Sequence, residues 1–226
     1  MKRKSIVLAA TAVMLMASLV VGGTLAYFTD TDDATNTFTV GDVKIDLIES
    51  QYYPQVDTDK TLDDVVADSE TYLAEYLAVN GEDMVPGRWV RKAPYVINTG
   101  TNDAYVRIHM DMSKELWDVV EVMFNSTEVT INQNIAMSVD ESADPVRMTF
   151  TYNDAIPAST EEGTESDNMT PYAPVWQFRL MEALDNDDLA AIQGDVVSNI
   201  NVYAEAIQAE GFADAAAAFA AYDAQQ

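Results

Sequence analysis

The chain has 226 residues, 38 of them acidic and 12 basic, and its formal net charge at neutral pH is −26. This acidity excludes binding to nucleic acids and anionic membranes, because phosphate groups repel a surface of the same sign. The absence of cysteine excludes a disulfide framework and thiol chemistry, so stability has to come from a hydrophobic core. The length suffices for such a core and suits one domain with insertions.

The N-terminal residues have the organisation of a secretory signal peptide. Three basic residues at positions 2–4 precede the apolar run 6–21, and a Gly-Gly pair ends that run. Thr24 and Ala26 are the small residues that a signal peptidase requires at −3 and −1, so Tyr27 would be the new N-terminus. The alternative is an uncleaved anchor helix, but the apolar run is shorter than the roughly 20 residues that span a bilayer comfortably. We therefore predict a secreted protein.

Removal of this leader makes the chain more acidic. Cleavage takes away three of the 12 basic residues and none of the acidic ones, so the remaining 200 residues carry a formal charge of −29. Such a charge implies cationic partners or divalent ions that screen the repulsion, although a plain acidic secreted protein is the simpler interpretation. No second stretch is apolar enough to span a bilayer, and we expect no stable membrane insertion after cleavage.

Short stretches with period-two alternation recur along the mature chain. In one of them Val43, Ile45 and Leu47 alternate with charged residues, which is typical of a half-buried strand. The expected strands cover residues 42–47, 88–98, 104–111, 129–139, 145–152, 175–181 and 200–206. Turn signals separate them, and no regular alternation of strands and helices is visible. The pattern predicts the all-β class, as an antiparallel sandwich with helical insertions.

Three segments have helical spacing instead. Residues 61–79 and 113–124 are the expected insertions, the second with Ser113 as its N-cap. Residues 213–224 form an alanine-rich C-terminal helix that would pack on the sandwich or cover a strand edge. The polar stretch 159–168 is expected to be an exposed loop. We thus divide the chain into a signal peptide (1–26), an N-terminal segment (27–35) and a single sandwich domain (36–226).

Several short segments carry a family resemblance. They are GGTLAYFTD (22–30), NTFTVG (36–41), VKIDL (43–47), VPG (85–87), NTG (98–100), YVR (105–107) and YAEAIQAEGF (203–212). Together they resemble the TasA/camelysin family, which usually has Asp after the Pro-Gly pair where this chain has Arg88. The segments near 50–82 and 113–195 match nothing in that family pattern.

The resemblance implies a jelly-roll β-sandwich that is exported with a signal peptide of the class processed by the dedicated peptidase SipW. It also implies self-association into extracellular fibres of a bacterial surface or biofilm matrix. In related fibres the N-terminal segment of one subunit completes the sheet of the next, which assigns Tyr27, Phe28 and Thr29 to a donor strand. The alternative is that residues 27–35 form a free tail or pack back on their own sandwich.

Part of this family is described as metalloprotease-like, and the sequence argues against that chemistry here. Zinc proteases of the usual kind need two histidines one helical turn apart, and His109 is the single histidine, on an expected strand. A serine triad would need the same His109, and no Gly-x-Ser-x-Gly elbow is present. A glycosidase needs only two carboxylates, but nothing singles out a pair. We therefore predict no catalytic residues, no metal ligands and no cofactor.

Other features have structural interpretations as well. Three acidic clusters lack the EF-hand spacing, since Leu62 stands where the loop that begins at Asp57 needs glycine, and we expect solvated loops. These clusters are Asp30/Asp32/Asp33, Asp57/Asp59/Asp63/Asp64 and Asp185/Asp187/Asp188. Asn125 and Asn168 fit a glycosylation pattern that a bacterial leader argues against. Core packing is the commoner use of the aromatic residues Trp89, Tyr95, Trp117, Trp176 and Phe178, which would otherwise form a sugar-binding face.

Three functions remain as hypotheses. The first is a structural fibre subunit that assembles through its mature N-terminus. The second is a non-assembling surface module that binds a sugar, a peptide or a cationic partner. The third is a camelysin-like metalloprotease, which the single histidine disfavours.

Overall fold

The computed structural model describes residues 29–32, 36–37, 43–52, 57, 59–61, 63–69, 71, 86–158, 168–192 and 200–225. The predicted signal peptide, Tyr27 and Phe28 lie outside these residues. The same is true of the C-terminal half of the expected helix 61–79 and of the expected loop up to residue 167. Within the described part, no helix is long and apolar enough to cross a membrane.

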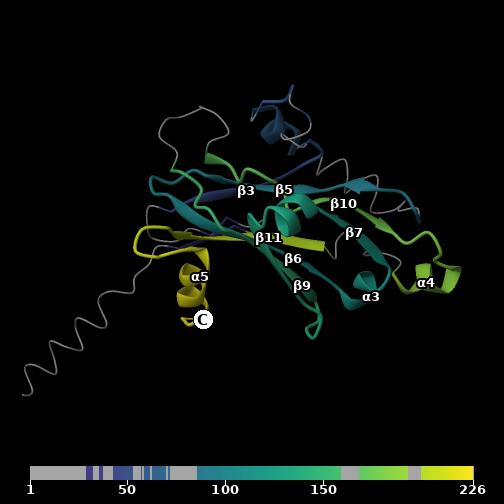
Figure 1. Cartoon of the computed structure of the whole chain (residues 1–226). Coiled ribbons are helices and arrows are strands. Elements are labelled where there is room, and N and C mark those ends of the chain that lie inside the picture. The colour runs from purple at the N-terminus through teal and green to yellow at the C-terminus, as the bar shows by residue number, and fades with distance from the viewer. Residues whose placement is uncertain are drawn as a thin grey trace, which may run out of the picture.

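The larger of the two layers is an antiparallel sheet of six strands in the order β2-β1-β11-β6-β9-β8 (Figure 1). Its strands are β1 (Thr29–Asp32), β2 (Asn36–Thr37), β6 (Ala104–Met112), β8 (Ile135–Asp140), β9 (Val146–Tyr152) and β11 (Ile200–Gln208). The long strands β6 and β11 form its centre and pair over nine residues.

The second layer consists of two short antiparallel sheets, β4-β10-β7 and β3-β5. Its strands are β3 (Ile45–Ser50), β4 (Val90–Arg91), β5 (Ala93–Asn98), β7 (Val120–Phe124) and β10 (Val175–Leu180). Only Lys92 separates β4 from β5, and its N–H donates to the Trp176 carbonyl at 3.0 Å. The two short sheets therefore continue one another through the stretch 90–98.

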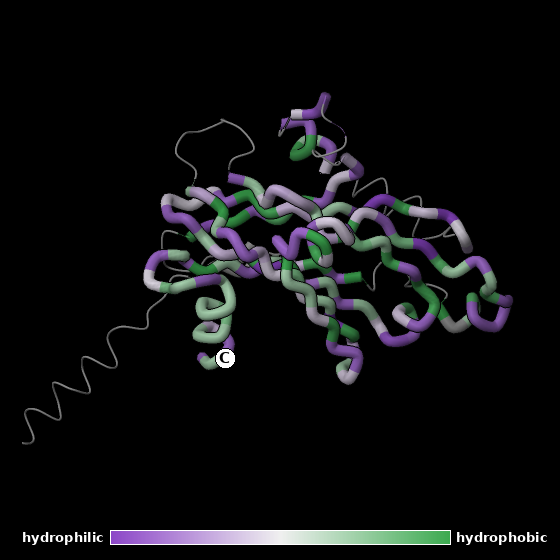
Figure 2. The backbone as a smooth tube through the Cα atoms, in the orientation of Figure 1, coloured by the Kyte–Doolittle hydropathy of each residue, from purple (hydrophilic) through white to green (hydrophobic). Residues whose placement is uncertain are grey.

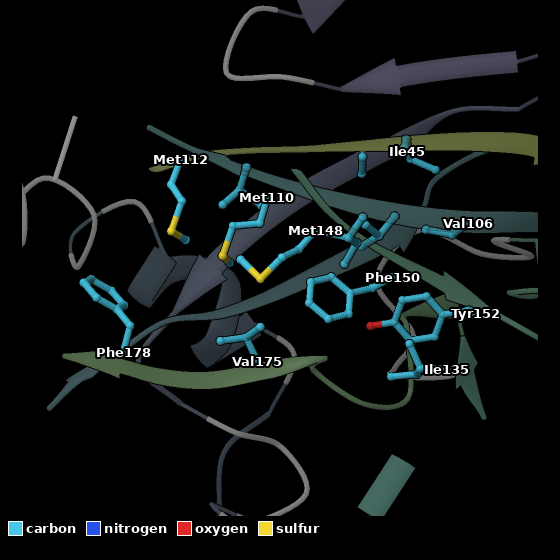
Figure 3. Packing of buried hydrophobic residues seen from close by; sticks show 14 of the residues in the cluster. Ile45, Val106, Met110, Met112, Ile135, Met148, Phe150, Tyr152, Val175 and Phe178 are labelled. Atoms are coloured by element: carbon cyan, nitrogen blue, oxygen red, sulfur yellow. The ribbon is translucent and has the colours of Figure 1, made fainter. Parts of the chain in front are cut away.

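The main core fills the space between the layers. Alternate residues of β6 and β9 face this space, among them Met110, Met148 and Phe150, and Val175 and Phe178 meet them from β10 (Figure 3). Hydrophobic residues lie along the central strands, whereas hydrophilic ones gather at the turns (Figure 2). The all-β sandwich with helical insertions predicted from the alternation is confirmed.

Helical segments cover parts of the outer faces. Residues 63–69 are helical, and Val65 packs there in a small cluster with Tyr95 and Ile97. Helix α5 (Ala215–Asp223) packs Phe219 against Ile207 of β11 on the outside of the large sheet. This confirms the predicted C-terminal helix. Helix α4 (Asn186–Ala191), which the sequence analysis did not predict, lies toward the opposite end of the sandwich (Figure 1).

The helix expected over residues 113–124 is wrong in its second half. Ser113 is the N-cap, its Oγ accepting a hydrogen bond from the Leu116 N–H at 3.3 Å, but α3 is only Lys114–Trp117. The following residues form β7, which pairs with β10. Val120 and Val122 alternate with Glu121 there, and pairing with a buried neighbour outweighs the helical spacing of the larger side chains.

The strand expected over residues 129–139 also begins too early. Residues Thr127–Ile131 form a π-helix, η1, and β8 starts only at Ile135. Asn125 causes this, because its carbonyl accepts the Val129 N–H at 3.0 Å and its side-chain Oδ1 accepts the Glu128 N–H at 3.4 Å. These local bonds hold β-branched residues in a turn of helix.

Candidate assembly site

The N-terminal segment predicted to be a donor strand lies on its own sandwich in this structure. Strand β1 runs antiparallel to β11, and Thr29 is opposite Ile207 while Asp32 is opposite Ala204. Of the three predicted donor residues, Thr29 is thus in a strand, and Tyr27 and Phe28 lie outside the described residues. For residues 29–32, the alternative of packing back on the same chain is the one observed.

The pairing of β1 is short compared with the strand that it covers. β1 meets only the stretch 204–207 of the nine-residue strand β11. The described residues provide no partner for 200–203 on that side. β2 pairs with β1 over two residues and forms the outermost edge. This edge of the large sheet is therefore a position that a strand from outside could take over through backbone hydrogen bonds.

An ionic network lies beside this position on the outer face of the large sheet. The Arg107 guanidinium binds the carboxylate of Glu205 on β11 and, at 2.6 Å, that of Asp223 on α5. It also lies 4.5 Å from the ring centroid of Phe219. Glu205 is the residue opposite Thr31 of β1. One side chain of β6 thus connects the strand beside β1 to the C-terminal helix.

His109 is part of this network. Its Nδ1 lies 2.9 Å from the Thr149 hydroxyl and its Nε2 lies 3.0 Å from a Glu205 carboxylate oxygen. Its ring stacks on Tyr203 at a centroid distance of 4.6 Å, and only 6 % of the side chain is exposed. Both ring nitrogens therefore have partners. Among the described residues, no three His, Cys, Asp or Glu side chains are grouped so that they could hold a metal ion.

The charged groups of the network affect one another's ionisation. Burial of Glu205 opposes its ionisation, but the hydrogen bond with His109 and the charge of Arg107 outweigh burial and hold the pKa of this carboxyl below its ordinary value. Burial and the Asp111 carboxylate raise the pKa of Tyr203 to about 12. Asp111 is itself bound by Arg147 through two hydrogen bonds of 2.8 and 2.7 Å.

This network was not predicted from the sequence, although a signal for it exists. Arg107, His109 and Asp111 are every second residue of β6 and point away from the core. Three ionisable residues at period two on a central strand indicate an outer face with partners on both neighbouring strands. Of these residues only His109 was considered from the sequence, as a metal ligand, as a triad member or, preferably, as a structural or exposed histidine of a strand.

Several acidic residues of the three clusters have structural roles. Asp57 forms a 3.3 Å ion pair with Arg91. Asp64 accepts a hydrogen bond from the Thr61 N–H at 2.8 Å, which lowers the pKa of that carboxyl. Asp185 and Asp188 form a capping box at the start of α4. Asp30 and Asp32 belong to β1, and Asp33 lies outside the described residues.

The glycosylation and sugar-binding alternatives find no support in the geometry. Asn125 is 3 % exposed and donates its amide to the Ala173 carbonyl, and the Asn168 amide donates to the Asn98 carbonyl. The five aromatic residues considered as a sugar face are buried or half-buried, as core packing predicts: Trp89, Tyr95, Trp117, Trp176 and Phe178.

Residues 1–68 match the family model described as camelysin metallo-endopeptidase. This part of the chain is thus similar to the TasA/camelysin family. The match includes the residues of the predicted signal peptide, β1 and β3, and it confirms the resemblance found in the N-terminal residues. It ends before the sheet strands that follow residue 86. The TasA/camelysin relationship therefore rests on the segment that contains the candidate assembly strand.

Curated proteins and solved structures give no further information on the family or the fold. No curated protein matches the chain. A solved structure, a chain from the crystal structure of a variant CaDoc0917–CaCohA2 complex at pH 5.5, is 14 % identical with a TM-score of 0.26. The similarity covers 44 % of this chain and 67 % of that chain. A TM-score this low establishes no shared fold.

Proposed function

We propose that this TasA/camelysin-like chain is an exported structural subunit of a bacterial surface or matrix fibre and assembles through its mature N-terminal segment. The observation that carries the proposal is the position of β1, a four-residue strand held at the side of β11 by backbone pairing. A strand of this kind can be replaced by the same strand of a second copy without loss of hydrogen bonds. The similarity to this family supports a secreted, TasA-like protein.

The energetics of such an exchange depend on concentration. The hydrogen bonds made by β1 are the same within one chain and between two, so they favour neither state. A strand attached to its own chain has an effective concentration of about millimolar. Exchange then needs an additional contribution, and burial of Tyr27 and Phe28 in a neighbour would contribute a few kcal/mol. We therefore expect filaments above a threshold concentration rather than at all concentrations.

The first test compares the mature chain from Tyr27 with a variant that lacks residues 27–35, by size exclusion and negative-stain microscopy. We expect filaments from the mature chain and a folded monomer from the deletion variant, with circular dichroism as the check on folding. A deletion variant that polymerises normally would refute the role of the N-terminal segment. A mature chain without filaments at any concentration would refute the fibre function.

A cysteine pair makes the test more specific, because the chain contains no cysteine. Asp32→Cys with Ala204→Cys places two thiols at opposed positions of β1 and β11. Oxidation of preformed filaments should give a ladder of covalent multimers on a non-reducing gel if the strand is exchanged. Monomers alone would show that β1 stays on its own chain. The single variant Asp32→Cys is the matched control and should give neither a ladder nor an internal link.

The family description raises peptidase activity as a second candidate. Against it, both nitrogens of His109 are occupied and the ring is buried. We propose that the chain has no catalytic activity. Casein digestion that a chelator abolishes would overturn this.

A further inference from the structure

The large sheet ends at β8 on the side away from β1. Within the described part of the chain, β8 pairs with β9 alone. Strand β7, the π-helix η1 and β8 follow one another here, and we refer to residues 122–139 as the neutral strip. An outermost strand presents unpaired backbone N–H and C=O groups to any strand that approaches.

The neutral strip is exceptional in a chain of this charge. Glu128 is its single ionisable side chain, and it is 6 % exposed. The amides of Asn132 and Asn134 bind the two Glu128 carboxylate oxygens at 3.0 and 2.7 Å. The strip therefore presents a neutral surface on a mature chain whose formal charge is −29.

The neutral strip is also where large hydrophobic side chains are exposed. Of the four such residues in the described part of the chain, Met123, Ile131 and Met137 lie in the strip, and Val66 lies elsewhere. Met137 is opposite Phe150 of β9, which is fully buried, yet Met137 itself is 39 % exposed. The core side of β8 is thus left partly uncovered, because the described residues provide no further strand beyond it.

Two edge strands of the second layer carry charges that discourage pairing. β3 contains Asp46 and Glu49, and β7 contains Glu121, which binds Arg179. Natural edge strands are commonly protected by charged residues or proline. β8 has neither from Ile135 to Val139 and reaches a charge only at Asp140.

We propose that the neutral strip docks a second copy of this chain, with β8 of one copy pairing antiparallel to β8 of the other about a two-fold axis. In such a contact the same surface of both copies meets, so a charge on the axis would meet its own copy and charges elsewhere would meet another part of the same surface. On a strongly acidic chain, a neutral patch can meet its own copy without repulsion between like charges. Pairing centred on Met137 places Met137 opposite its own copy and covers it, and the two Asp140 side chains lie at opposite ends.

This contact lies at the edge of the sheet opposite to β1, so it does not need strand exchange and would join two subunits side by side. With exchange at the β11 side, it would pair two fibres. Without exchange, it would give a discrete dimer.

The test introduces opposite charges at the centre of β8. Mature chains carrying Met137→Glu or Met137→Lys are measured by sedimentation velocity and cross-linking, separately and as an equimolar mixture. We expect self-association to weaken at least about tenfold in each variant alone, since like charges then face each other, and to return in the mixture. Val66→Glu, which adds the same charge at an exposed hydrophobic residue outside the strip, should behave as the unmodified chain.

The mixture also serves as the check on folding, because only folded partners can restore pairing. Unchanged association of the single variants, or a mixture that does not recover, would refute the β8 contact. Unmodified mature chain that never pairs side by side would refute it too. Filaments that form normally with Met137→Glu but fail to associate laterally would support both proposals. Dimers with this charge pattern in the absence of filaments would support the β8 contact and refute the fibre function.

Discussion

Replacement of Arg107 by glutamine removes the guanidinium that joins β6 to β11 and to α5. The largest effect comes from Glu205, whose side chain is 14 % exposed and would keep His109 and the more distant Tyr222 hydroxyl as partners. Breaking a buried ion pair costs about 3–5 kcal/mol, and the residual exposure and the histidine reduce this to about 2–3 kcal/mol.

The other contacts of Arg107 contribute less. The Asp223 side chain is 55 % exposed, so this pair adds less than about 1 kcal/mol. The guanidinium lies over Phe219 and Tyr222 at 4.5 and 5.4 Å from the ring centroids, and these contacts add about 0.5–1 kcal/mol. We expect Arg107→Gln to lower the free energy of unfolding by about 3–4 kcal/mol.

Urea denaturation measures this directly, with an unchanged m-value indicating that the unfolding reaction is the same. The double variant Arg107→Gln with Glu205→Gln should lose less than the sum of the single variants by at least about 1 kcal/mol, because the unbalanced carboxylate is removed as well. A loss below about 1 kcal/mol for Arg107→Gln, or strict additivity in the double variant, would refute the stabilising role of the Arg107–Glu205 pair.

Two further predictions concern pH and a turn. Because the pKa of Glu205 is lower in the folded chain than its ordinary 4.5, its ionised form stabilises the fold. The stability that this carboxylate contributes is complete above that value and is lost as the pH falls below it. In urea titrations, Glu205→Gln should therefore lose less stability between about pH 5 and pH 3 than the unmodified chain does. Equal losses in the two proteins would contradict the lowered pKa. Gly87 has a φ of 82°, and a Cβ there would lie 2.9 Å from Glu182 Cγ. Gly87→Ala should lower the free energy of unfolding by about 1–2 kcal/mol and Gly87→Asn by less, since asparagine tolerates a positive φ better. A larger loss for Gly87→Asn than for Gly87→Ala in urea denaturation would exclude backbone strain as the cause.

Strands with a clear period-two pattern were predictable from the sequence. Residues 145–152 and 175–181 correspond to β9 and β10 within one residue at each end. Their alternation follows directly from a core on one side, which is a local property of the chain. The C-terminal helix was also predictable, because alanine has the highest helix propensity.

The errors arose where a local signal competed with a partner distant in sequence. Phe124 has helical spacing to Trp117, but β10, some 50 residues later, provides the pairing that makes residues 120–124 a strand. The partners of His109 lie on β9 and β11, up to 96 residues away, and no spacing in the sequence indicates them. The same is true of the position of β1 beside β11.

The ionic network on β6 also determines how the central strands align. A slip of β6 by one residue would turn Arg107, His109 and Asp111 into the core and expose Ile108 and Met110, because side chains alternate between the two faces. Burial of those charges would cost far more than the backbone bonds regained. Any strand that pairs with β11, from its own chain or another, therefore meets a template whose alignment is already decided. Successive subunits built on such a template would repeat at one spacing.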